Sequence, residues 1–160
     1  MSEVSSEIKK IAFKNVDEIL DFAIKTEEDS NYIYTEWAKK QVNQSIQQFF
    51  EELASEELKH KEYILAVKGG KSLTSSEKEI PDLKISDYMV DANASIEMDY
   101  QEALTLAMHR EKMAFKIYSY LADISTNANM KSTFQILAQE EAKHKLRLEI
   151  IYDDEILKDN

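Results

Sequence analysis

Two Glu-x-x-His segments are the residues of this chain best suited to bind metal. They are Glu57-Leu58-Lys59-His60 and Glu141-Ala142-Lys143-His144, and they contain two of the three histidines in the sequence. Residues three apart lie on one face of a helix, so each segment presents a carboxylate and an imidazole in the same direction. One such segment is a weak signal, because charged residues are common on exposed helix faces.

An internal repeat makes the signal strong. Each half of the chain reads Glu, six residues, Tyr, twenty-two residues, Glu, two residues, His, and equivalent residues are 84 positions apart. A fixed spacing over four chemically distinctive positions indicates that one structural unit occurs twice. The equivalent pairs are Glu27 and Glu111, Tyr34 and Tyr118, Glu57 and Glu141, and His60 and His144.

Four long helices are needed to position these residues. The chain has only two glycines and one proline, which favours helices over sheets and tight turns. The apolar spacing predicts helices over 16–42, 45–68, from between 95 and 99 to 125, and 129–157. Asn15 is a plausible cap for the first helix, and Gly69-Gly70 is a stop signal for the second. The stretch 69–93 reads as a long connection, with a short helix near 85–90.

Short turns within each pair of helices predict two antiparallel hairpins, and the long connection joins them. We therefore expect an all-α fold, an antiparallel four-helix bundle that forms one domain over residues 1–160.

The candidate ligands interrupt apolar stripes, so the sequence places them in the core. Leu53 and Ala54 precede Glu57 and His60 on one buried face, and Leu137 and Ala138 precede the second pair in the same way. Buried ionised carboxylates are very costly unless cations compensate them. Four carboxylates carry −4, which two divalent metal ions neutralise. Oxygen and nitrogen ligands without sulfur suit iron or manganese, with zinc as a substitute, and the nearby tyrosines favour redox-active iron.

The composition excludes several other functions. A net charge of −11 without a basic run argues against nucleic-acid binding. The absence of cysteine rules out disulfides, zinc–thiolate sites and iron–sulfur clusters. The first ten residues lack the apolar core of a signal peptide, and no apolar run is long enough to span a membrane, so we expect a cytoplasmic protein.

The pattern over 16–157 resembles the ferritin-like di-iron carboxylate superfamily, and the rubrerythrin type in particular. The resemblance implies a ferritin-like bundle with Glu57 and Glu141 bridging two irons. It implies Glu27 and Glu111 as terminal ligands, with one nitrogen each from His60 and His144. A separate interpretation of the sequence gives Glu56 and Glu140 a supporting role, each orienting the histidine of the opposite hairpin.

Some positions depart from that pattern. Leu58 and Ala142 stand where a haem-binding relative has methionine, so haem is not expected. Without a cysteine-bearing rubredoxin domain, electrons have to come from a separate protein. Tyr34 and Tyr118 have two open interpretations, as catalytic residues that donate hydrogen bonds or electrons at the centre, or as packing residues. His109 is interpreted as a surface residue.

Three functions remain to be distinguished. The first is an enzyme whose iron pair reacts with hydrogen peroxide or oxygen, as in peroxide reduction or ferrous-iron oxidation. The second is iron binding or storage without turnover, and the third is a bundle that binds no metal. We also expect the chain to form a homo-oligomer, a dimer or larger.

Overall fold

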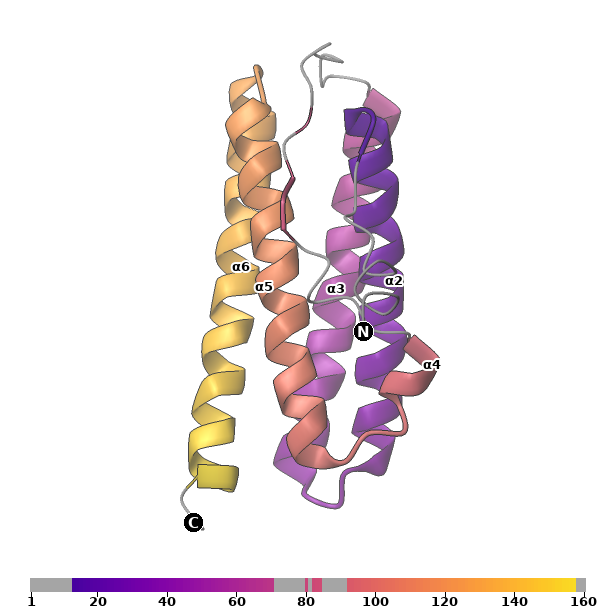
Figure 1. Cartoon of the computed structure of the whole chain (residues 1–160), viewed down its shortest axis with the longest axis vertical. Coiled ribbons are helices and arrows are strands. Elements are labelled where there is room, and N and C mark those ends of the chain that lie inside the picture. The colour runs from indigo at the N-terminus through magenta and orange to yellow at the C-terminus, as the bar shows by residue number, and fades with distance from the viewer. Residues whose placement is uncertain (1–12, 71–79, 81, 85–91, 158–160) are drawn as a thin grey trace, which may run out of the picture.

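The computed structural model describes residues 13–70, 80, 82–84 and 92–157, and long helices make up most of this part of the chain (Figure 1). They are α2 (Val16–Lys40), α3 (Gln44–Gly70), α5 (Tyr100–Ile124) and α6 (Ala128–Tyr152). A short helix, α4 (Ala92–Ser95), precedes α5, and a π-helical turn (Asp153–Leu157) follows α6. The predicted all-α four-helix bundle is confirmed.

Side-chain caps fix where three of the helices begin. Asn15, Asp99 and Asn127 each accept a hydrogen bond from a backbone N–H of the first turn, at 2.9, 2.8 and 2.8 Å. These contacts satisfy N–H groups that have no partner within the helix. The cap predicted at Asn15 is therefore confirmed.

The structure moves several predicted boundaries by a few residues. Helix α2 ends at Lys40, two residues before the predicted end, and α3 continues through Gly69 and Gly70. Glycine weakens a helix but does not block it, so the predicted stop is two residues too early. The short helix predicted near 85–90 lies outside the described residues. Helix α4 was not predicted, and it is fixed to α2 by a 3.0 Å hydrogen bond from the Trp37 indole to the Ser95 carbonyl.

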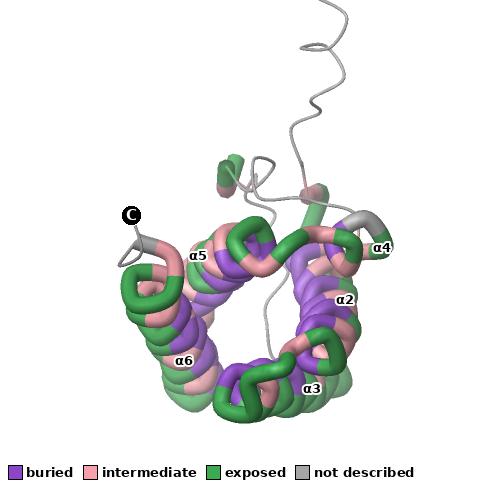
Figure 2. The backbone as a smooth tube through the Cα atoms, turned by 90° about the horizontal axis from the view of Figure 1, so that it is seen from below, coloured by how far each residue is buried: buried purple, intermediate pink, exposed green. Residues whose placement is uncertain are grey.

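The four helices surround one interior, as the end-on view in Figure 2 shows. Helices α2 and α3 pack along each other, as do α5 and α6, and the two hairpins contact each other more sparsely. Buried faces point inward on all four helices. None of the described helices is both long and apolar enough to cross a membrane.

The core has two apolar layers with a polar layer between them. One layer includes Leu20, Ile64, Leu121 and Phe134, and the other includes Trp37, Phe50, Leu104 and Leu148. Along every helix, the candidate ligands fall between the residues of the two layers. Each layer therefore closes one end of the polar region against water.

Candidate metal centre

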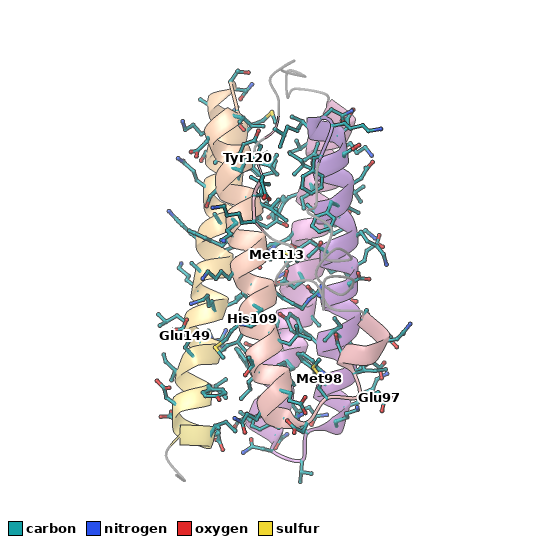
Figure 3. The ribbon with its side chains drawn as sticks, in the orientation of Figure 1. Glu97, Met98, His109, Met113, Tyr120 and Glu149 are labelled. Carbon is teal, nitrogen blue, oxygen red and sulfur yellow. The ribbon has the colours of Figure 1, made fainter. Side chains whose placement is uncertain are left out.

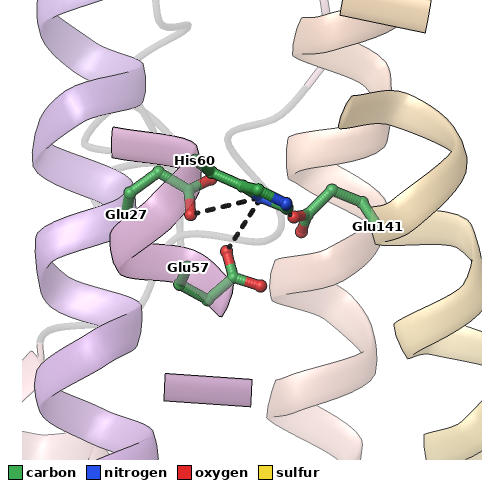
Figure 4. Close-up of side chains that lie close together, drawn as sticks. All are labelled: Glu27, Glu57, His60 and Glu141. Carbon is green, nitrogen blue, oxygen red and sulfur yellow. Dashed lines mark ion pairs between the residues drawn. The ribbon is translucent and has the colours of Figure 1, made fainter. Parts of the chain in front are cut away.

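All six predicted ligands converge in the middle of the bundle. Their exposed fractions are 1% for each glutamate and His60, and 3% for His144. Figure 4 shows one half of the cluster, in which three carboxylates from α2, α3 and α6 turn toward one imidazole. The structure thus brings together all six predicted ligands, which are Glu27, Glu57, His60, Glu111, Glu141 and His144.

The six side chains form two overlapping groups of four. One group is Glu27, Glu57, His60 and Glu141, and the other is Glu57, Glu111, Glu141 and His144. Within each group, one potential ligand atom from every residue lies within 4.8 Å of all the others. Two residues, Glu57 and Glu141, belong to both groups, which is the arrangement that two bridging carboxylates need.

Four polar atoms of this cluster have no hydrogen-bond partner within the described part of the chain. They are Oε2 of Glu27, Nδ1 of His60, Oε2 of Glu111 and Oε1 of Glu141. The Nδ1 atom of His60 lies only 2.5 Å from Oε1 of Glu141, yet the two do not have hydrogen-bond geometry. Buried polar atoms are normally paired, so four unpaired atoms that face one another fit a group that binds cations.

Each imidazole is oriented by a carboxylate from the opposite hairpin. The Nε2 atom of His60 lies 2.5 Å from Oε2 of Glu140, and Nε2 of His144 contacts Glu56 in the same way. A carboxylate on one ring nitrogen fixes the tautomer and leaves the other nitrogen, Nδ1, facing the cluster. The predicted contacts of Glu56 and Glu140 are confirmed.

The two tyrosines also cross between the hairpins. The Tyr34 hydroxyl donates to Oε1 of Glu111 at 2.9 Å, and the Tyr118 hydroxyl donates to Oε1 of Glu27 at 2.5 Å. Burial raises the pKa of both tyrosines well above 10, so they are protonated donors at neutral pH. His109 lies on the exposed face of α5 (Figure 3) and takes no part in the cluster.

Without a cation, the charged form is disfavoured for three of the four carboxylates, which are Glu27, Glu57 and Glu141. Burial and the neighbouring charge of Glu57 raise the pKa of Glu27 well above its usual value. The pKa of Glu141 is likewise raised well above 4.5, by burial first and then by the charges of the other three carboxylates. Burial opposes the ionisation of Glu111, but its contacts with Glu141 and His144 lower its pKa. Although burial opposes the charge on His144, its contacts with Glu111 and Glu57 raise its pKa to about 11.

Sequence reasoning missed Arg110, a buried cation next to the cluster. Its side chain is 5% exposed and donates to the Ser30 hydroxyl at 3.0 Å and the Thr26 carbonyl at 3.1 Å. A signal was present, because Arg110 lies on the same helical face as Ala107 and Ala114, in the stripe that contains Glu111.

A pocket of about 450 Å³ lies between α3 and α6, outside the histidines. The orienting carboxylates of Glu56 and Glu140 line it, and their side chains are 41% and 43% exposed. The remaining lining residues are both histidines, Lys59, Tyr63, Lys143 and Arg147. The centre is therefore buried, but its histidine side is close to solvent.

Four antiparallel helices around buried carboxylates and imidazoles define a ferritin-like bundle. A solved structure from Thermotoga maritima, described as that of a ferritin-like diiron-carboxylate protein, has this fold with a TM-score of 0.75. The two sequences are 24% identical, and the match covers 88% of this chain and 95% of the other. No curated protein matches the chain. A family model for Rubrerythrin matches residues 18–152, and the chain belongs to the rubrerythrin family.

Proposed function

We propose that this protein is a non-haem di-iron carboxylate protein. One ion would be held by Glu27 and His60, the other by Glu111 and His144, and Glu57 and Glu141 would bridge them. Two divalent ions would neutralise the four carboxylates, and they would compete with protons for the same ligand atoms. The proposal rests above all on the four buried atoms that have no hydrogen-bond partner, which come from four different residues of the cluster.

We further propose that the reduced iron pair reacts with hydrogen peroxide or oxygen. Iron at such a site supplies redox chemistry, and the chain itself contributes ligands and protons. Tyr34 and Tyr118 keep the terminal glutamates in place, because each donates to the terminal glutamate of the opposite hairpin. Electrons for repeated turnover would come from a separate protein.

Anaerobic reconstitution with ferrous iron tests this function. The wild-type protein is expected to bind about two irons per chain and, after peroxide is added, to develop the visible absorption of an oxo-bridged ferric pair. A parallel reaction with oxygen compares the two oxidants by rate. Loss of one terminal ligand in Glu111→Gln should abolish the absorption. The matched control is Glu62→Gln, because Glu62 is exposed on α3.

Two results would contradict the proposal. The first is wild-type protein that binds no iron, or that binds it and shows no spectral change with either oxidant. The second is Glu111→Gln that behaves like Glu62→Gln. The alternative of iron storage predicts a very large particle with many irons per chain, and size measurement of the same sample distinguishes it.

A further inference from the structure

Arg110 is a buried charge that the proposed ligand set does not use. Both of its hydrogen-bond partners, the Ser30 hydroxyl and the Thr26 carbonyl, are neutral. Among the described residues, no carboxylate forms an ion pair with it. A buried cation without an anionic partner is costly, so the charge calls for an explanation beyond local packing.

The guanidinium lies beside the centre. Arg110 directly precedes Glu111 on α5, and Ser30 follows Glu27 by one turn on α2. Residues one turn apart have Cβ atoms about 5–6 Å from each other, which puts the guanidinium on the order of 10 Å from the ligand oxygens. The positive charge of Arg110 also affects a residue of the cluster. Burial and the charge of Glu111 raise the pKa of Tyr34, and the charge of Arg110 lowers it.

Only one half of the repeat carries this charge. The residue equivalent to Arg110 in the first half is Thr26, and the residue equivalent to Ser30 in the second half is Ala114. The ligands therefore occur in both halves of the repeat, but the guanidinium occurs in only one, and the equivalent position in the other half is uncharged.

The charge has different consequences with and without metal. Without metal, Arg110 offsets part of the negative charge of four clustered glutamates. With two divalent ions, the four buried glutamates are already balanced, and the guanidinium leaves the buried groups with a net charge of +1. The carboxylates of Glu56 and Glu140 are not counted, because they are partly exposed and water screens their charge. A single monovalent anion at the centre would then restore neutrality.

We propose that Arg110 selects a small monovalent anion as the external ligand of the metal-loaded centre. This inference rests on the proposed function, because it requires two bound metal ions. A unit charge about 10 Å away, at an effective dielectric constant of about 20, changes an anion's binding constant roughly tenfold. Hydroperoxide, hydroxide and azide share the required charge and size.

Ligand titrations of the oxidised, iron-loaded protein test the inference. Azide is the anionic probe and imidazole the neutral one, and the visible spectrum gives both dissociation constants. Arg110→Gln is expected to weaken azide binding about tenfold and to leave imidazole binding unchanged within about twofold. Arg110→Lys should keep most of the azide affinity. The control Lys131→Gln, which removes an exposed charge of α6, should change neither constant.

A second variant removes the net charge but keeps the arginine. Ser30→Asp places a carboxylate against the guanidinium, which Ser30 already contacts, and should weaken azide binding as Arg110→Gln does. The Ser30→Asp variant still tests the inference if Arg110→Gln does not fold. The inference is wrong if azide binding is unchanged in a variant that still binds two irons, or if azide and imidazole weaken equally. Failure of the wild-type protein to bind two irons would instead refute the proposed function.

Discussion

Replacing Glu141 by glutamine is expected to stabilise the metal-free protein and to remove its response to metal. Glu141 is 1% exposed, and burial together with three neighbouring carboxylates raises its pKa well above 4.5. The folded state therefore favours the protonated form of this carboxyl more strongly than the unfolded chain does. Glutamine is neutral in both states and can donate to Glu111 as the protonated acid does, so the variant avoids this cost.

The size and the sign of the effect follow from proton linkage. A carboxyl whose pKa is higher in the folded state than in the unfolded state does not lower the free energy of unfolding at pH values below both pKa values. As the pH rises above the pKa of the unfolded state, the free energy of unfolding falls, until the pKa of the folded state is reached. Each pH unit over which only the folded state keeps the proton costs about 1.4 kcal/mol, so the gain from the substitution is on the order of a few kcal/mol at pH 7. For a chain of this length, a gain of about 2 kcal/mol raises Tm by roughly 4–8 °C.

Thermal melts of the metal-free protein between pH 4.5 and pH 7.5 measure this gain. The advantage of Glu141→Gln over wild type should be near zero at pH 4.5 and should increase toward pH 7. With ferrous iron under anaerobic conditions, wild type should gain about 3 kcal/mol at a hundredfold excess over Kd, and the variant should gain much less. Exposed Glu62→Gln on α3 should follow wild type throughout. A gain that does not vary with pH, or no gain at pH 7, would refute the reasoning.

Three further predictions concern metal affinity and the contacts around it. Metal-induced stabilisation should increase from pH 6 to pH 8, because bound metal displaces a proton from His144, whose pKa is raised to about 11. Metal titration at several pH values checks this, and a flat profile contradicts it. Glu140→Gln should weaken metal binding about 10–100-fold without unfolding the bundle, because Glu140 orients His60. Calorimetric titration measures the change, and unaltered affinity would show that the contact is incidental. Tyr118→Phe should destabilise the metal-free protein by about 1.5–3 kcal/mol, because it removes the hydrogen bond to Glu27. Denaturant unfolding tests this, with exposed Tyr63→Phe as the control, and equal stability of the two variants counts against it.

The sequence predicted the parts of the structure that depend on periodicity. Helix α2 begins at Val16 as its apolar spacing and the cap at Asn15 require, and the six candidate ligands share one interior because their stripes do. The crossed contacts of Glu56 and Glu140 also followed from the repeat, since each residue lies one position before a glutamate that faces the core. Helical periodicity carries this information because it determines which side of each helix a residue occupies.

Features that depend on tertiary contacts were not predictable in the same way. A four-residue helix such as α4 has too few residues for a periodic signal, and it is fixed by Trp37 from another helix. The end of α3 at Gly70 depends on whether the two glycines continue the helix, and glycine adopts both helical and non-helical backbone conformations. Arg110 and Thr26 occupy equivalent positions of the repeat but are different residue types, so a comparison that looks for identical residues does not identify Arg110.

The candidate metal centre requires both hairpins, because its contacts run from one hairpin to the other. Tyr34 and Glu56 belong to the first hairpin and contact Glu111 and His144 in the second, and the equivalent residues of the second hairpin contact the first. Each proposed metal ion would also take ligands from both hairpins. Ions bound between α3 and α6 would add to the attraction between the hairpins on that side. Metal binding and hairpin docking would therefore be thermodynamically linked, and each should stabilise the other.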